Sequence, residues 1–383
     1  MRRTLRPARC RIALLGFGTV GSAVARRLTG PHSHDALSHL ELTHIFDRRA
    51  SHKREIFAAS GSHARQLVWT TSIDAILTSD VDVVVEAVGG VEPASDWIRA
   101  ALLAGKSVVT ANKQAVARHG AALLALAERQ GRQLRFEAAV GGAMPIVRAL
   151  GGGLAGDRVT RIVAILNGTT NAVLSRMEAA GCSLDEAIAD ARARGYAEAD
   201  PSLDLDGGDA RAKLSILCAI AFGLRVEPDA IPARSVASMT QDDFDRARRT
   251  GGSVRQIAHA EYDRASGTLT AWVAPAVVAD GSIFARTTGP QNAAVITGAY
   301  SGDITITGAG AGGDATAVAI LSDVVAIARD RAAIVPAPVL STPRTIVGFP
   351  TTLHAERADS AEKVVVCGVS GFCVDRHSLA EAV

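Results

Sequence analysis

Aromatic side chains are scarce in this chain of 383 residues, where three Trp, three Tyr and nine Phe make up 4% of the total. Hydrophobic residues of all kinds nevertheless reach 48%, and there are 36 glycines. A large core is therefore available, and we expect Ala, Val, Leu and Ile to fill most of it. The length predicts roughly two or three domains.

Cysteine is also rare, and no two cysteines have the CxxC spacing. The odd number of five, scattered from Cys10 to Cys373, argues against a disulfide framework and against a zinc site. We therefore expect a cytoplasmic protein. The basic N-terminus is followed by a short strand pattern and a glycine turn, so it does not resemble a secretory signal peptide.

Charge of one sign is not in excess, because 41 Lys and Arg residues are matched by 39 Asp and Glu residues. Nucleic acids and anionic membrane surfaces call for a dense basic face. The short arginine clusters near the N-terminus and at 246–249 are typical of solvated segments. The chain also lacks an uninterrupted apolar run of ~18–20 residues, which a membrane helix needs. We expect neither nucleic acid nor membrane as a partner.

Histidine is concentrated between residues 32 and 63, but without the spacing of a metal-binding motif. The segment is polar, so we interpret its histidines as solvated rather than as a metal site. They are His32, His34, His39, His44, His52 and His63.

The order of strand, glycine turn and helix near the N-terminus is typical of dinucleotide binding. Residues 11–15 predict a buried strand and 22–28 a helix, with the GxGxxG pattern between them. The first glycine permits the tight turn, the second allows close approach of a pyrophosphate, and the third lets helix and strand pack. The helix N-terminus offers free N–H groups to phosphate. The fingerprint residues are Gly16, Phe17, Gly18, Thr19, Val20 and Gly21.

The next predicted strand, 40–46, ends at Asp47 and is followed by Arg48 and Arg49. An acid at this place commonly binds the ribose hydroxyls of NAD, whereas an arginine can bind the 2′-phosphate of NADP. The sequence therefore leaves the choice between NAD and NADP open.

Further strands of a parallel sheet are predicted at 81–90, 107–113 and 133–137, with a helix at 97–104. Ligands of such sheets lie beyond the carboxyl ends of the strands. Gly89 in the turn after the first of these strands and Lys113 at the end of the second are therefore candidates for cofactor or substrate contact. Lys113 could equally be a surface lysine at the start of a helix.

The second half of the chain predicts a largely antiparallel sheet backed by helices. Strands are expected at 158–166, 269–278, 293–297 and 303–307. Asn171 is the expected N-cap of a helix at 172–180. Ser183 and Glu186 have the spacing of a capping box that opens the next helix. The fold class is therefore α/β, with an N-terminal Rossmann-type parallel sheet and a second α+β domain.

The most densely charged stretch, 195–213, lies directly before the apolar helix predicted at 214–222. It contains Glu198, Asp200, Asp204, Asp206 and Asp209 and ends at Lys213. Asp209 and Lys213 are four residues apart, so on one helix their side chains meet. An exposed ion pair or a simple N-cap is the alternative, but the neighbouring apolar helix favours a functional pair.

Near residue 310 a glycine-rich loop precedes a strong helix pattern at 314–329. The loop could offer N–H groups to an anion, or it could be a flexible connector back to the first domain. After about residue 335 the chain is rich in Pro and Thr, with one strand-like run at 363–369 to which we assign no role.

Together these segments resemble one family over roughly residues 10 to 330. GFGTVG, VVTANK, FEAAVGGAMPI, ILNGTTN, GYAEADPSLD, DGGDARAK and GAGAGGDATA are similar to the motifs of homoserine dehydrogenase. The resemblance implies NAD(P)-dependent interconversion of L-homoserine and L-aspartate 4-semialdehyde, on the branch to threonine and methionine. It divides the chain into a nucleotide domain at 1–145, a substrate and dimerisation domain at 146–312, a returning helix at 313–335 and a tail at 336–383.

The resemblance also implies roles for particular residues. Lys213 would be the acid/base, and Lys113 would lie between nicotinamide and substrate. Glu198 and Asp209 would hold the substrate's α-ammonium beside the Gly195 backbone. Gly310 would close over the cofactor. Glu137, Val140, Gly142 and Met144 match positions that hold a monovalent cation such as Na⁺ or K⁺, and the family forms a homodimer on the second domain's sheet.

The sequence departs from the family pattern at its C-terminal end, because the residues after Arg329 are too few for a regulatory ACT domain. Two other functions remain as alternatives. An oxidoreductase of another amino-acid semialdehyde that uses a thiol would need a reactive cysteine, but Cys218 lies within an apolar helix pattern. A non-catalytic NAD(P) sensor would have no need of Lys213.

Overall fold

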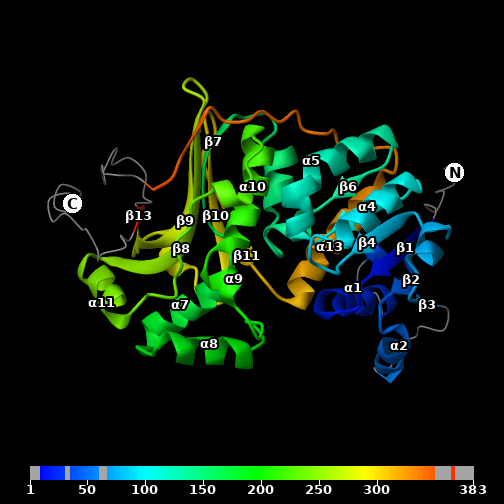
Figure 1. The fold of residues 1–383 in the computed structure, drawn as a ribbon, viewed down its shortest axis with the longest axis horizontal. Coiled ribbons are helices and arrows are strands. Elements are labelled where there is room, and N and C mark those ends of the chain that lie inside the picture. Colours follow the sequence, from blue (N-terminus) through cyan, green and yellow to red (C-terminus); the bar gives the residue numbers. More distant parts are fainter. Residues whose placement is uncertain (1–8, 31–34, 60–66, 350–363, 367–383) are drawn as a thin grey trace, which may run out of the picture. The chain divides into compact units, whose positions relative to one another are not determined.

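The computed structural model describes residues 9–30, 35–59, 67–349 and 364–366. It divides into two compact units, Met1–Ala143 with Gly312–Val339, and Met144–Ala311 with Leu340–Val383. Figure 1 shows the first unit in blue and cyan, with the orange helix α13 (Gly313–Arg329) added from late in the sequence. Within the described residues, no helix is both long enough and apolar enough to cross a membrane.

The first unit is built on a six-stranded sheet in the order β3-β2-β1-β4-β5-β6, in which every neighbouring pair is parallel. The strand order 3-2-1-4-5-6 is the order found in dinucleotide-binding sheets. The expected parallel sheet is therefore confirmed. Its strands are β1 (Cys10–Leu15), β2 (Leu40–Phe46), β3 (Val68–Thr70), β4 (Val83–Glu86), β5 (Ser107–Thr110) and β6 (Leu134–Arg135).

Helices cover this sheet because its strands carry apolar side chains toward both faces. Ile12 and Leu14 of β1 face a core shared with α1 (Thr19–Thr29) and α13, which pack against each other. The helices α4 (Ala94–Leu103) and α5 (Lys113–Arg129) also pack together and contact β5 and β6. Smaller helices are α2 (Ala50–Ala59) and α3 (Ile73–Leu77).

Several boundaries in this unit differ from the sequence expectation. The strands expected at 81–90 and 133–137 are shorter, as β4 and β6, and the helix expected at 97–104 begins earlier, as α4. The strand expected to run to Lys113 ends at Thr110, because Asn112 caps the next helix by accepting the Ala115 N–H at 3.0 Å. Lys113 is therefore the first residue of α5 rather than the end of a strand. The first helix begins at Thr19, directly after the second glycine of the fingerprint, and not at residue 22.

The second unit is built on a sheet in the order β11-β10-β7-β8-β9-β12, with β13 also paired to β9. All of its pairs are antiparallel except β12 with β9. This confirms the expected mostly antiparallel sheet. Its strands are β7 (Val159–Ile165), β8 (Gly252–Asp263), β9 (Thr268–Ala279), β10 (Gln291–Gly298), β11 (Gly302–Ala309), β12 (Thr345–Val347) and β13 (Val364–Val366).

Helices α7 (Gly168–Ala180) and α10 (Gly208–Phe222) lie against this sheet, in contact with β8. Between them the chain forms α8 (Leu184–Ala193), which opens with the predicted Ser183–Glu186 capping box, and the short α9 (Ser202–Leu205). The expectation that Asn171 caps α7 is wrong. Asn167 is the cap, and Asn171 lies one turn inside the helix.

Near the C-terminus, residues 340–349 and 364–366 belong to the second unit, where β12 and β13 extend its sheet. The strand expected at 363–369 is represented by β13 at its centre, and its other residues lie outside the described part of the chain. The remaining elements of this unit are α6 (Ile146–Arg148), α11 (Gln241–Arg249), α12 (Ile283–Arg286), a π-helical turn at Ala149–Gly153 and a 3-10 turn at Pro228–Ala230.

Candidate active site

The glycine turn after β1 is shaped by close backbone contacts. Gly16 has a φ of +91°, and a Cβ on it would approach the Ala87 carbonyl oxygen to 2.8 Å. A Cβ on Gly21 would collide with the Gly16 carbonyl, so helix and turn pack only with glycine there. Gly18 is the N-cap of α1 and has open space at its Cα. The fingerprint therefore has the geometry that a pyrophosphate needs.

Asp47 links this turn to the end of β2. Its carboxylate accepts the Phe17 N–H at 3.0 Å through Oδ2 and the Arg49 N–H at 2.8 Å through Oδ1. The two arginines after it border the same hollow, and both are exposed. The cavity has a volume of about 480 Å³ and is lined by Gly16, Phe17, Gly18, Phe46, Asp47, Arg48, Arg49, Ala87, Val88 and Trp97.

Glu86 at the end of β4 organises the neighbouring strand ends, a role that its place in an apolar strand did not predict. It is fully buried and accepts N–H groups of Val88 and Gly89 at 2.8 and 3.2 Å. The Thr110 hydroxyl also donates to it. Asn112 closes the network by donating to the Gly90 carbonyl at 2.6 Å.

This network fixes the turn after β4 against the start of α5. Gly89, with a φ of +83°, thus lies at the carboxyl edge of the sheet as predicted from the strand pattern. Lys113 begins α5 and is half-buried.

The glycine-rich segment near 310 ends at the first helical residue of α13, which belongs to the first unit. A Cβ on Gly313 would approach the Thr19 carbonyl oxygen to 2.9 Å, so the N-terminal ends of α1 and α13 lie side by side. Gly310 belongs to the second unit. A side chain there would collide with the carboxamide of Asn292, which is buried in β10.

In the second unit, α10 buries an acid and a base on one face. The Lys213 Nζ donates to Asp209 Oδ2 at 2.7 Å and to the Leu166 carbonyl oxygen at 2.8 Å. The side chains are only 11% and 4% exposed, respectively. The ammonium has three N–H donors, so these two bonds leave one for a further acceptor. This arrangement excludes the exposed surface pair that was the alternative for Asp209 and Lys213.

Asn167, the N-cap of α7, also contacts the ion pair of Asp209 and Lys213, and the sequence analysis missed it. Its Nδ2 donates to Asp209 Oδ2 at 2.8 Å and to Asp204 Oδ1 at 2.7 Å. Asn292 donates to the Leu166 carbonyl at 3.3 Å, the same oxygen that Lys213 binds. The ILNGTTN and acidic segments, far apart in sequence, thus meet around one carboxylate.

The loop after α8 places the other expected substrate residues at the surface. Gly195 has a φ of +74°, and both Gly195 and Glu198 are exposed. Arg192 supports the loop by donating to the Glu198 and Ala199 carbonyls at 3.2 and 2.7 Å. The Thr169 hydroxyl of α7 donates to the Tyr196 carbonyl at 2.7 Å, which ties the loop to the segment that carries Asn167.

The four expected cation ligands fall on both sides of the boundary between the units. Glu137, Val140 and Gly142 are buried in the first unit, and Gly142 has a φ of +61°. Met144 is the first residue of the second unit and is buried there. Among the described residues, no group of three or more His, Cys, Asp and Glu residues could hold a metal ion. His32, His34 and His63 lie outside the described residues.

Cys218, on α10, does not have the setting of a nucleophile. Cys218 is fully buried in α10, and burial raises the pKa of its thiol to about 12. A thiol of that kind carries almost no thiolate at neutral pH. The geometry therefore supports proton transfer by Lys213 and argues against a covalent thiol mechanism at Cys218.

Comparison with known proteins gives the same family for both units. The family model for homoserine dehydrogenase matches residues 145–325, and the model for its NAD-binding domain matches residues 16–137. Homoserine dehydrogenase of Corynebacterium glutamicum is 38% identical over 328 residues, which cover 84% of this chain and 72% of that protein.

Solved structures agree. A homoserine dehydrogenase from Thiobacillus denitrificans gives a TM-score of 0.79 at 30% identity, covering 89% of this chain and 81% of the other. A hyperthermophilic archaeal homoserine dehydrogenase in complex with NADPH gives 0.70 at 27% identity, covering 84% and 98%. The chain therefore belongs to the homoserine dehydrogenase family, NAD(P)-dependent oxidoreductases that interconvert L-homoserine and L-aspartate 4-semialdehyde.

Proposed function

We propose that Lys213 is the acid/base of this reaction and that Asp209 holds it in place. The buried ion pair on α10, with its 2.7 Å contact, is the observation that carries this proposal. A buried ammonium beside a carboxylate keeps its orientation without competition from water. Its remaining N–H can be directed at a substrate oxygen.

Proton and hydride move separately in this scheme. Bound NAD(P) accepts or supplies the hydride. When homoserine is oxidised, the neutral Lys213 amine takes the proton of the alcohol as hydride leaves the same carbon. When the semialdehyde is reduced, the Lys213 ammonium gives its proton to the carbonyl oxygen. Asp209 stays ionised and stabilises the ammonium form.

Substrate binding is proposed for the residues around this pair. Glu198 and Asp209 supply negative charge for the α-ammonium of the substrate, and the Gly195 backbone offers a polar contact. The exposure of Glu198 leaves its carboxylate accessible to a ligand. Lys113 is proposed as a second catalytic residue that also contacts the cofactor, on the basis of the VVTANK motif.

A monovalent cation is proposed at Glu137, Val140, Gly142 and Met144. Carbonyl and carboxylate oxygens are hard ligands of the kind that such ions prefer. The burial of these four residues and the left-handed backbone at Gly142 fit a turn whose carbonyls are held away from water. A homodimer formed on the sheet of the second unit is proposed from the family resemblance.

For the cofactor, we propose NADP(H) over NAD(H). Both oxygens of Asp47 accept backbone N–H groups, from Phe17 and Arg49, so two of the roughly four acceptor sites of this carboxylate are already used. Arg48 borders the same cavity and is exposed, so its guanidinium is available for a 2′-phosphate. The archaeal relative solved with NADPH supports this preference.

The test is reduction of NADP⁺ and NAD⁺ by the purified chain with L-homoserine as the electron donor. We expect turnover with both nucleotides and a higher kcat/KM for NADP⁺. Arg48→Ala should raise the KM for NADP⁺ by about tenfold, because a charge-assisted contact is lost, and leave the KM for NAD⁺ nearly unchanged. Failure of the intact chain to reduce either nucleotide with homoserine would contradict the proposed function. Equal effects of Arg48→Ala on the KM for NADP⁺ and the KM for NAD⁺ would contradict the proposed preference for NADP⁺.

A further inference from the structure

We propose that Asn167 is a positioning residue, whose carboxamide orients the Asp209 carboxylate against Lys213. The inference rests on the proposed role of Lys213 as the acid/base. Asn167 is 4% exposed and lies at the point where β7 ends and α7 begins. It reaches the acidic segment of α9 and α10 across the interior of the second unit.

All three hydrogen bonds of the Asn167 side chain are defined by the groups around it. Its Oδ1 accepts the Thr170 N–H at 2.7 Å and thereby caps α7. Its Nδ2 donates to Asp204 Oδ1 at 2.7 Å and to Asp209 Oδ2 at 2.8 Å. A carboxylate cannot donate and a backbone N–H cannot accept, so chemistry fixes which end of the amide points to which partner.

The chemistry of the amide explains why this position suits asparagine. The carboxylates of Asp204 and Asp209 both approach the side-chain nitrogen of Asn167, and each accepts one N–H of this neutral amide. Asp209 Oδ2 therefore carries two donors, from Lys213 and from Asn167, which restricts rotation of the carboxylate. An aspartate at 167 would keep the capping oxygen but would replace both donors by a third negative charge.

Other charged side chains on the elements that pack against α10 are engaged elsewhere. Arg161 of β7 pairs with Asp303 at 3.7 Å, and Arg255 of β8 with Glu178 at 2.7 Å. Arg211 on α10 itself lies 3.9 Å from Asp229. Asn167 contacts Asp204 and Asp209 directly, and Lys213 through Asp209.

The test compares Asn167→Asp with Asn171→Asp, a matched change one turn along the same helix. Asn171 donates to the Thr287, Gly289 and Gln291 carbonyls and to neither acid. For Asn167→Asp we expect kcat for homoserine oxidation to fall on the order of 10²-fold through misplacement. The rising limb of its pH–rate profile should move up by roughly one pH unit, because added negative charge favours the ammonium.

Asn171→Asp should lower the melting temperature and leave that limb in place. Asn167→Ser guards against a folding defect, since serine keeps a capping oxygen but lacks the two amide donors. It should retain the melting temperature and lose about tenfold in kcat.

Three results would overturn the inference. Asn167→Asp could match the intact chain in kcat and pH profile. Both aspartate variants could lose kcat only in proportion to their stability, with no shift of the limb, which would make Asn167 a helix cap alone. Third, the intact chain could be inactive on homoserine, which would contradict both this inference and the proposed function. The first two results, obtained with an active intact chain, would contradict the inference alone.

Discussion

At the scale of single residues, the ion pair of Asp209 and Lys213 is buried on α10, where proton transfer is proposed. Asp209 and Lys213 were predicted from their four-residue spacing, because that spacing brings side chains together on any helix. The burial of these two side chains could not be predicted from their spacing, since it depends on the sheet against which α10 packs. The contacts of Asn167 could not be predicted, because its partners Asp204 and Asp209 are 37 and 42 residues away.

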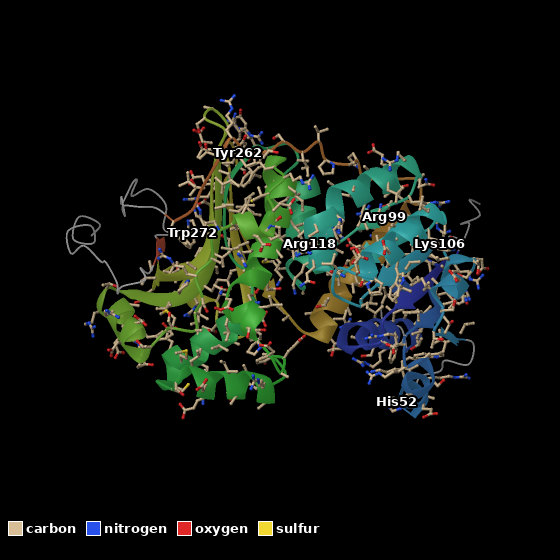
Figure 2. The ribbon with its side chains drawn as sticks, in the orientation of Figure 1. His52, Arg99, Lys106, Arg118, Tyr262 and Trp272 are labelled. Carbon is tan, nitrogen blue, oxygen red and sulfur yellow. The ribbon has the colours of Figure 1, made fainter. Side chains whose placement is uncertain are left out.

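His259 in β8 is a half-buried titratable group of another kind, with a side chain that is 15% exposed. Its ring stacks on Trp272 of β9, with centroids 5.1 Å apart and planes at 6°, and Figure 2 shows Trp272 on this sheet. Nδ1 has no hydrogen-bond partner among the described residues. Burial, aided by Arg161, lowers the pKa of His259 to about 4.

This depressed pKa predicts a loss of stability in acid. Above the unfolded pKa of about 6.5 the histidine is neutral in both states. As the pH falls from there toward 4, the unfolded chain binds the proton and the folded chain does not, so the free energy of unfolding decreases, by roughly 2 kcal/mol at pH 5. Urea unfolding at pH 7.5 and pH 5 measures this decrease.

The matched control for that measurement is His259→Phe, which keeps an aromatic ring on Trp272 and cannot titrate. The variant should lose less stability between the two pH values than the intact chain does. Equal losses in both proteins would show that His259 is not responsible.

At the scale of elements, the sequence predicted helices and strands better than their ends. The β2 strand has the predicted bounds, because an apolar run stops at Asp47. The start of α7 was misplaced by four residues, since Asn167 and Asn171 are both good caps by residue type. Only the tertiary contacts distinguish them, because Asn171 is needed to bind the carbonyls of the 287–291 segment.

The β8 strand was not predicted, and its polar residues explain why. The adjacent Arg255 and Gln256 interrupt the apolar alternation that marks a strand, although His259 and Glu261 fit it. In the structure Gln256 donates to the Asp204 carbonyl at 3.4 Å, and Arg255 is buried among backbone carbonyls. Arg255 and Gln256 are accommodated within the sheet because both find partners that lie far away in sequence.

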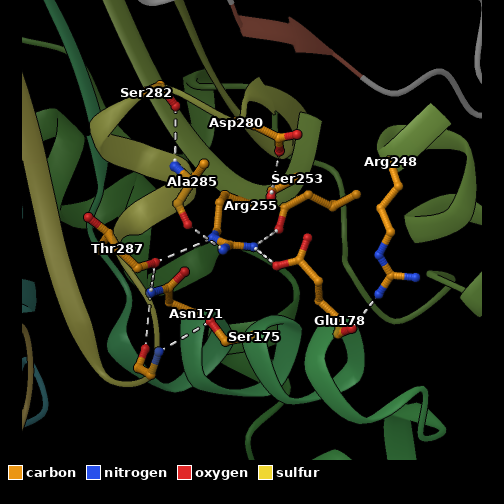
Figure 3. Close-up of polar contacts among 12 residues, drawn as sticks. Asn171, Ser175, Glu178, Arg248, Ser253, Arg255, Asp280, Ser282, Ala285 and Thr287 are labelled. Atoms are coloured by element: carbon orange, nitrogen blue, oxygen red, sulfur yellow. Dashed lines mark hydrogen bonds and ion pairs between the residues drawn. The ribbon is translucent and has the colours of Figure 1, made fainter. Parts of the chain in front are cut away.

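Arg255 joins three elements, as Figure 3 shows. It pairs with Glu178 near the end of α7 at 2.7 Å and donates to the Ala285 carbonyl of α12 at 2.8 Å and to the Thr287 carbonyl at 3.3 Å. The guanidinium fork suits this set of acceptors, and a lysine could not reach all of them. Its side chain is 1% exposed.

Arg255→Met should therefore lower the free energy of unfolding by about 3–5 kcal/mol, because it leaves the Glu178 carboxylate without its cation. Chemical unfolding measures the change. The double variant Arg255→Met with Glu178→Leu should recover part of this lost stability, since both charges are then removed and no carboxylate is left without its cation. A single variant as stable as the intact chain, or a double variant whose losses simply add, would contradict this account.

At the scale of the whole molecule, the sequence predicted both sheets and their strand directions from periodicity and turn signals. It did not predict that β12 and β13 join the second sheet, because three-residue strands carry too little pattern. The nucleotide turn was recognisable because its chemistry is local, lying within residues 16–21. The ion pair of Asp209 and Lys213 was recognisable on the same ground, whereas Asn167 and Glu86 act through contacts that no local pattern contains.

The central claim is that the buried Lys213 on α10 moves the proton during hydride transfer. The most direct test is the steady-state rate of homoserine oxidation by Lys213→Ala, beside Arg211→Ala as a control from the same helix that pairs with Asp229. Lys213→Ala should still bind NADP⁺ and keep its fold, but its kcat should fall by about 10²–10⁴-fold, while Arg211→Ala stays near the intact rate. A Lys213→Ala variant that oxidises homoserine as fast as the intact chain would contradict the claim.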